Sequence, residues 1–140
     1  MNSLESNELI EIIKNLTKPV LGICIGMHVL FDRSEEHDTK CMEIISGDIK
    51  KFDSMLNLKI PQMGWNKVSF LLENTKKLDN YYYFANSYYS QIYENTLASA
   101  EYGRPFAAAV QKDNFIGCQF HPEKSSSAGI EFLDYFLSIN

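Results

Sequence analysis

Residues 19–31 join a short apolar strand to a helix through a single sharp turn. Residues 19–23 read Pro-Val-Leu-Gly-Ile, a continuously apolar run of the kind that is buried on both faces of a parallel sheet. From residue 25 to residue 31 the apolar side chains return at helical spacing. Because such a strand must be covered on both faces, this segment predicts an α/β fold.

Before and after this segment the chain alternates between helical and extended patterns. A helix is expected over residues 7–16, and Pro19 prevents it from continuing. Its shared apolar face consists of Leu9, Ile12, Ile13 and Leu16. A polar loop is expected at 33–39. Apolar and aromatic stretches then predict extended segments at 43–52, 59–70, 81–89 and 96–102.

The last third of the chain predicts a hairpin followed by a helix. Residues 106–111 and 115–120 are strand-like, and the Lys-Asp-Asn sequence at 112–114 tolerates turn geometry. A helix is expected after Gly129, with an apolar stripe of Ile130, Leu133, Phe136 and Leu137. Since no internal repeat or linker interrupts the pattern, residues 1–140 are expected to form one domain.

Composition narrows the class of protein further. Of the 140 residues 45% are hydrophobic, which is enough for a real core, yet no apolar run approaches the roughly 18 residues that would cross a bilayer. The formal net charge is -5, and the Lys50-Lys51 and Lys76-Lys77 pairs are isolated, which argues against nucleic-acid binding. We therefore expect neither a membrane nor a nucleic-acid partner.

The N-terminal residues and the cysteines indicate a reducing compartment. Residues 1–8 lack the basic segment that opens a secretory signal, so a cytoplasmic location is expected. The three cysteines, at positions 24, 41 and 118, are odd in number and are not spaced like a zinc site. Each is interpreted as a reduced thiol, and no metal is expected.

Cys24 is the candidate nucleophile. The sequence Gly-Ile-Cys-Ile-Gly at 22–26 matches a nucleophile elbow, in which a strand ends, the chain turns sharply and a helix begins. Gly22 and Gly26 permit the tight turn and the approach of a substrate, and a helix N-terminus favours a thiolate. The alternative is a buried structural cysteine between two packing glycines.

Among the three histidines, His121 is the candidate base. It follows a predicted strand, and in extended chain residues i and i+2 point the same way, so Glu123 can orient its ring. The alternative is a loop histidine beside a surface glutamate. His28 would share a helix face with Cys24 and is a candidate substrate contact. His37 lies in a charged loop and is expected at the surface.

Two motifs together resemble a known family. The Pro-Val-Leu-Gly-Ile-Cys-Ile-Gly-Met sequence at 19–27 and the Gln-Phe-His-Pro-Glu sequence at 119–123 are similar to the motif pair of class I glutamine amidotransferases. Three further stretches resemble the glutaminase subunits of imidazole glycerol phosphate synthases: Pro-Gln-Met-Gly-Trp-Asn at 61–66, Ser-Tyr-Tyr at 87–89, and Lys124-Ser125.

The resemblance implies a fold and a reaction. The fold is a three-layer α/β arrangement around a mixed, mainly parallel central sheet. Cys24 attacks the side-chain amide of glutamine, His121 moves the proton, and Glu123 orients His121. Ammonia then passes to a TIM-barrel cyclase subunit, which makes imidazole glycerol phosphate in histidine biosynthesis. No metal or organic cofactor is implied.

The same resemblance assigns binding residues. Those expected around glutamine are Gly22, Gly26, His28, Ser87 and Tyr88, and those expected to face the cyclase are Met63, Gly64, Trp65 and Asn66. For Trp65 the alternative is an ordinary core aromatic. A hydrolase of another class acting on a small amide is disfavoured by the stretch at 61–65 and by Lys124-Ser125.

Three departures from the family pattern leave other functions open. Only one helix precedes Pro19, so the family's N-terminal strands and oxyanion loop are expected to be absent from this sequence. His28 stands where the family has glutamine, and Asn86 where it has histidine. The alternatives are a subunit that supplies ammonia for surface-sugar synthesis and a truncated, non-catalytic interaction module.

Overall fold

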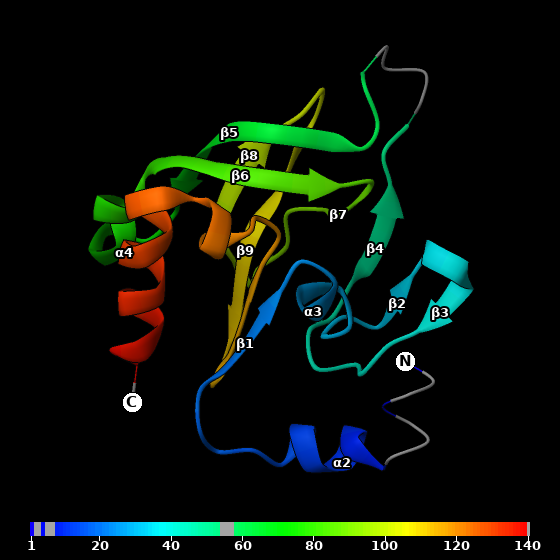
Figure 1. The fold of residues 1–140 in the computed structure, drawn as a ribbon. Coiled ribbons are helices and arrows are strands. Elements are labelled where there is room, and N and C mark those ends of the chain that lie inside the picture. Colours follow the sequence, from blue (N-terminus) through cyan, green and yellow to red (C-terminus); the bar gives the residue numbers. More distant parts are fainter. Residues whose placement is uncertain (2–3, 5–7, 54–57, 140) are drawn as a thin grey trace.

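The computed structural model describes residues 1, 4, 8–53 and 58–139, and its strands form one extended, strongly curved sheet (Figure 1). The strands are β1 (Val20–Ile23), β2 (Arg33–Ser34), β3 (Thr39–Lys40), β4 (Asp48–Lys51), β5 (Gln62–Phe70), β6 (Asn80–Asn86), β7 (Tyr88–Ser90), β8 (Thr96–Glu101), β9 (Pro105–Lys112) and β10 (Phe115–Cys118). The α-helices are α2 (Leu9–Lys14), α3 (Ile25–His28) and α4 (Ser126–Leu137), and the short 3₁₀ helices are η1 (Glu36–Asp38), η3 (Glu73–Leu78) and η4 (Pro122–Lys124).

The sheet is mostly antiparallel, so the expectation of a mainly parallel sheet was wrong. Its order is β3-β2-β4-β7-β9-β8-β5-β6, with β10 beside β9 and β1 beside β10. Within the described residues only β1–β10 and β2–β4 pair in parallel. Connectivity is part of the reason: parallel neighbours need long crossovers, whereas β8–β9 and β9–β10 are joined by short connections that give antiparallel pairs.

The predicted hairpin and the predicted elbow meet at one end of this sheet. β9 and β10 pair antiparallel around Asp113, which has a φ of 51°. β1 lies parallel to β10 with Ile23 opposite Cys118. Residues that follow the two strands therefore emerge at the same edge of the sheet.

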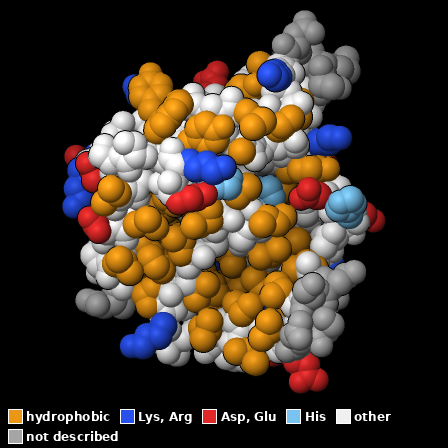
Figure 2. All heavy atoms as spheres, in the orientation of Figure 1, with side chains coloured by type: hydrophobic (Ala, Val, Ile, Leu, Met, Phe, Trp, Pro, Cys, Tyr) orange, Lys and Arg blue, Asp and Glu red, His pale blue; other side chains and the backbone are white. Residues whose placement is uncertain are grey.

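Among the described residues β1 pairs with β10 alone, which leaves its other edge without a strand. Figure 2 shows histidine side chains (pale blue) near the middle of this view, with hydrophobic side chains (orange) spread widely below them. An unpaired edge beside apolar surface is a place where a further segment can bind.

The largest core cluster is aromatic and packs α4 against the sheet. The Tyr82 and Phe120 rings lie 4.2 Å apart, and Phe132 of α4 meets Phe120 at 5.0 Å. The C-terminal helix is thus confirmed, but its predicted apolar stripe was only partly right: Phe136 packs against the core, whereas Ile130 and Leu137 are 62% and 74% exposed. Its buried residues are Ala128, Gly129 and Phe132, and the first two are small, which lets the start of α4 approach its neighbours closely.

Other predicted segments are present in the structure, but their boundaries differ from the predicted ones. The helix expected over residues 7–16 is α2, and Asn7 lies outside the described residues. The loop expected at 33–39 contains β2 and η1, the 43–52 segment is a strand only from residue 48, and the 81–89 segment divides into β6 and β7 at Ser87. In the part of the chain that the structure describes, no helix is both long and apolar enough to cross a membrane.

Candidate active site

Cys24 occupies a strained turn between β1 and α3. Its φ is 52° and its ψ is -108°, a conformation that non-glycine residues rarely adopt. The Cys24 N–H donates to the carbonyl of Cys118 at 2.7 Å, which extends the β1–β10 ladder to this residue. The sharp strand-to-helix turn is the geometry that presents a nucleophile at the end of a sheet.

The two glycines of the elbow differ in what they permit. A Cβ at Gly22 would lie 2.3 Å from the carbonyl oxygen of Gly26, so only glycine fits there. A Cβ at Gly26 would meet no atom within 4 Å. Gly22 is therefore required by the turn itself, whereas Gly26 leaves open space beside it.

The Cys24 sulfur is contacted by a glutamine whose role the sequence did not reveal. Nε2 of Gln119 donates to Sγ at 3.7 Å, and Oε1 of Gln119 lies 2.7 Å from Nε2 of His28. Gln119 is fully buried and His28 is 4% exposed. A polar residue directly after a buried strand was the one available signal, since 95 residues separate Gln119 from Cys24.

Opposing effects act on the thiol. Burial raises the pKa of Cys24, and the negative charges of Glu36 and Glu123 raise it further, while hydrogen bonds from the Ile25 N–H and from Gln119 lower it. The net shift is upward. Formation of the thiolate thus depends on the hydrogen-bond donors around Sγ.

His121 and Glu123 form a hydrogen-bonded pair on the neighbouring strand end. Nδ1 of His121 lies 2.7 Å from Oε1 of Glu123. The His121 N–H donates to the carbonyl of Tyr83 at 2.8 Å, and the Ser125 hydroxyl donates to the carbonyl of His121 at 2.6 Å. The turn is also packed tightly against α4, where a Cβ at Gly129 would lie 1.9 Å from the carbonyl oxygen of Pro122.

Cys24 and His121 follow adjacent parallel strands, yet the described residues include no hydrogen bond between their side chains. In structures without substrate, such catalytic hydrogen bonds are often long and tighten only in the complex. The negative charge of Glu123 is nevertheless close enough to raise the pKa of Cys24. The roles of Cys24, His121 and Glu123 in catalysis stay predictions.

A cavity of about 390 Å³ opens directly beside Cys24. It is lined by Cys24, Ile25, His28, Glu36, Pro61, Ala85, Asn86, Ser87 and Tyr88. The volume suits a small polar ligand. Ser87, Tyr88 and His28, three residues predicted to bind substrate, thus border one space with the candidate nucleophile, although their binding role stays a prediction. Among the described groups, Oδ1 of buried Asn86 has no hydrogen-bond partner.

The stretch expected to face a partner lies on β5 and is largely exposed. Met63 and Trp65 are 63% and 53% exposed, so the reading of Trp65 as a core aromatic was wrong. The Trp65 ring meets the Tyr83 ring edge-on at 6.2 Å, and Nζ of Lys124 lies 5.8 Å above the Tyr83 ring. This surface, which we call the aromatic face (Met63, Trp65, Tyr83), therefore continues to the turn that carries His121.

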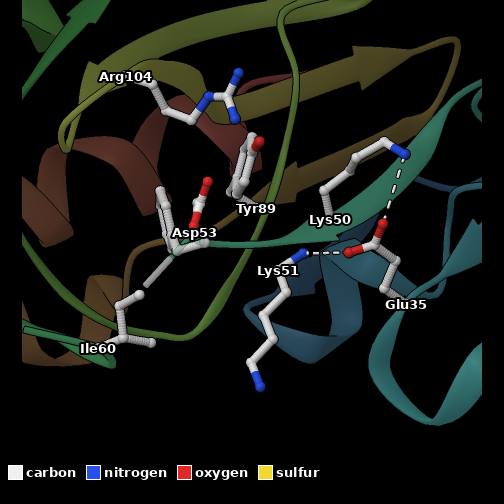
Figure 3. Close-up of a pocket in the computed structure, with 8 residues that line it drawn as sticks. Glu35, Lys50, Lys51, Asp53, Ile60, Tyr89 and Arg104 are labelled. Atoms are coloured by element: carbon white, nitrogen blue, oxygen red, sulfur yellow. Dashed lines mark hydrogen bonds and ion pairs between the residues drawn. The ribbon is translucent and has the colours of Figure 1, made fainter. Parts of the chain in front are cut away.

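A second, larger cavity, with a volume of about 670 Å³, is lined by residues of the paired strands β4 and β7 together with Glu35 and Arg104 (Figure 3). Nζ of Lys50 lies 3.6 Å from Oε1 of Glu35, and the guanidinium of Arg104 lies 5.2 Å above the Tyr89 ring. Its lining contains neither cysteine nor histidine. Within the described part of the chain, no group of three or more His, Cys, Asp or Glu residues could hold a metal ion.

Residues 2–138 match the family model "Glutamine amidotransferase class-I". The match agrees with the elbow at Cys24 and with the His121–Glu123 pair. The chain belongs to the class I glutamine amidotransferase family. Within that family it is of the HisH type: it is 44% identical over 144 residues to the imidazole glycerol phosphate synthase subunit HisH of Salmonella typhimurium, covering 99% of this chain and 73% of that protein. The corresponding subunit of Pasteurella multocida is 42% identical over 98% of this chain and 71% of its own length.

Solved structures support the fold. A crystal structure of a glutamine amidotransferase superimposes with a TM-score of 0.65 at 14% identity, covering 94% of this chain and 65% of that one. A glutamine amidotransferase from Thermotoga maritima gives a TM-score of 0.57 at 15% identity, covering 95% of this chain and 53% of its own. The α/β fold of class I glutamine amidotransferases is thereby confirmed. The chain spans less than two thirds of each of these structures.

Proposed function

We propose that this chain is a glutaminase subunit that hydrolyses glutamine to glutamate and ammonia. The observation that carries the proposal is Cys24, held in a strained elbow beside a 390 Å³ cavity, with the hydrogen-bonded His121–Glu123 pair at the end of the adjacent strand. The HisH relatives are subunits of a synthase, and they support the same assignment.

The reaction proceeds by covalent catalysis. The thiolate of Cys24 attacks the amide carbon of the glutamine side chain, and the Ile25 N–H, the amide that follows the nucleophile, donates to the developing oxyanion. His121 takes the proton of the Cys24 thiol and gives it to the amide nitrogen as the C–N bond breaks, so that ammonia leaves and a glutamyl thioester remains. Water activated by His121 then releases glutamate, while Glu123 holds the ring of His121 in orientation throughout.

The cavity beside Cys24 supplies the glutamine site. Ser87 and Tyr88 border it from the β6–β7 junction, and His28 borders it from α3. The open space at Gly26 lets the amide reach Sγ, and Gly22 fixes the turn that aims the sulfur. Main-chain groups and a few polar side chains around a small cavity are sufficient to orient an amino acid.

Ammonia is passed to a TIM-barrel cyclase subunit, which makes imidazole glycerol phosphate for histidine biosynthesis in the cytoplasm. The aromatic face, together with Gly64 and Asn66, is the surface that meets the cyclase in a heterodimer. Exposed aromatic side chains are the residues that most often anchor protein interfaces, and this surface adjoins the turn of His121.

The test is covalent labelling by a glutamine analogue that carries a diazoketone in place of the amide. Alkylation of Cys24 expels dinitrogen and leaves a stable thioether, which mass spectrometry of peptides locates. We expect labelling at Cys24, protection by excess glutamine, no labelling of Cys24→Ala, and normal labelling of a Cys41→Ala control. Absence of glutamine-protected labelling, together with intact cyclase binding, would instead favour a non-catalytic interaction module.

A further inference from the structure

A buried amide–imidazole pair lies directly behind the candidate nucleophile. His28 of α3 and Gln119, which follows β10, are joined by the 2.7 Å contact between Nε2 and Oε1. The other end of the Gln119 carboxamide faces Sγ of Cys24 at 3.7 Å. His28 is 4% exposed and Gln119 is fully buried, so neither side chain can exchange these partners for bulk water.

The chemistry of the pair determines which ring nitrogen of His28 carries the hydrogen. A carboxamide accepts only at its oxygen and donates only at its nitrogen. Because Oε1 of Gln119 faces Nε2 of His28, that nitrogen must donate. The opposite tautomer would turn the carboxamide over and direct its oxygen at Sγ, where it would repel a thiolate.

The remaining nitrogen of His28 does not oppose this arrangement. Among the described residues Nδ1 is buried and has no hydrogen-bond partner. It therefore exerts no preference of its own on the tautomer. The ring of His28 borders the cavity, but its one engaged polar atom is directed at Gln119.

We propose that His28 is a positioning residue: as the neutral Nε2–H tautomer it holds the carboxamide of Gln119 with the amino group toward Cys24, where that group stabilises the thiolate. The proposal rests on the proposed role of Cys24 as nucleophile and deepens it. Gln119 touches the reacting sulfur, whereas His28 acts through Gln119.

The surroundings of Cys24 make such a donor necessary. The titratable groups that interact with Cys24 electrostatically are Glu36 from η1, Glu123 from η4 and Cys118 at the end of β10, and Glu36 also acts on His28. Burial and both carboxylates raise the pKa of Cys24. Removing the amino group of Gln119 removes the one side-chain hydrogen bond that lowers this pKa.

The first test measures the rate at which iodoacetamide alkylates Cys24 as a function of pH, followed by peptide mass spectrometry. For Gln119→Met and His28→Met we expect the apparent thiol pKa to rise by about one unit, which lowers the rate near neutral pH about tenfold. His28→Gln retains an N–H donor at similar reach and should restore the wild-type profile. Unchanged profiles in folded Gln119→Met or His28→Met protein would overturn the proposal.

The second test uses the unaltered protein and does not depend on variants that fold. Nitrogen NMR of labelled histidine distinguishes the two neutral tautomers at pH 7.5. We expect His28 in the Nε2–H form, and finding it in the Nδ1–H form or charged would contradict the mechanism. Neither measurement requires glutamine turnover, so an inactive enzyme would refute the proposed function without deciding this inference.

Discussion

Nδ1 of His121 lies 2.7 Å from Oε1 of Glu123, although the side chain of Glu123 is 53% exposed. An exposed pair contributes little to stability, and its effect lies in fixing which ring nitrogen is free. With Nδ1 donating to Glu123, Nε2 of His121 is the nitrogen that can exchange protons with substrate.

We predict that His121→Asn lowers kcat for glutamine hydrolysis by about 10²–10⁴-fold, because the general acid and base is lost. Glu123→Gln should cost less, about tenfold, since an amide oxygen can still accept from Nδ1 but cannot stabilise the imidazolium. Steady-state kinetics with the cyclase partner present would measure both. Equal losses in the two variants, or a loss of stability in Glu123→Gln, would contradict this division of roles.

Gly22→Ala should destabilise the fold, because its Cβ would lie 2.3 Å from the Gly26 carbonyl oxygen. We expect the free energy of unfolding to fall by about 1–3 kcal/mol, the usual cost of overpacking. Gly26→Ala is the matched control: its Cβ meets open space within α3, and replacing a helical glycine stabilises by up to about 1 kcal/mol. If urea unfolding showed the free energy of unfolding changing with the same sign in both variants, the different roles assigned to Gly22 and Gly26 would be refuted.

The burial of His28 leads to a specific prediction for how stability depends on pH. Burial lowers the pKa of His28 below its ordinary value of 6.5, so near that pH the unfolded chain binds a proton that the folded chain does not. The contribution of His28 to stability therefore declines as pH falls below 6.5, with a slope of at most about 1.4 kcal/mol per pH unit, until the lower folded pKa is reached.

His28→Gln should remove this component of the slope, whereas His37→Gln, at an exposed site, should retain it. Urea unfolding curves collected between pH 5 and pH 8 would measure the difference. If wild type and His28→Gln gave parallel curves across that range, His28 would not be the buried neutral imidazole that the structure describes.

Trp65→Ala should weaken binding to the cyclase by about 30-fold or more, since a central interface tryptophan typically contributes at least about 2 kcal/mol. Because Trp65 is 53% exposed, the variant should fold as stably as wild type. Leu137→Ala, at a 74% exposed position on α4, is the control and should bind normally. Titration calorimetry would distinguish these outcomes, and unchanged affinity of Trp65→Ala would exclude the aromatic face as the interface.

Local signals in the sequence were sufficient for the elbow, the β9–β10 hairpin and α4, because each depends on residues close together along the chain. The contact of His121 with Glu123 was predicted from extended chain, and it is present, although the structure forms it through the 3₁₀ helix η4 that begins at Pro122. The direction of most strand pairs was not predictable in this way, since it depends on which segments become neighbours. The exposure of Ile130 similarly depends on how α4 is rotated against the sheet.

The contacts of Gln119 were beyond sequence reasoning for a related reason. His28 and Gln119 are 91 residues apart, and only the parallel pairing of β1 with β10 brings them together. Because of this pairing, the ring of His28, which follows the elbow, contacts a protein side chain, that of Gln119. Residue type and local spacing carry no information on such a contact.

The most direct test of the account is glutamate release from glutamine by the purified chain with its cyclase partner, beside a Cys24→Ala variant whose fold is verified by circular dichroism. We predict turnover that depends on the partner and disappears in Cys24→Ala. Equal glutamate release by the Cys24→Ala variant, or none by the complete complex, would contradict the assignment of Cys24 as the nucleophile of a glutaminase.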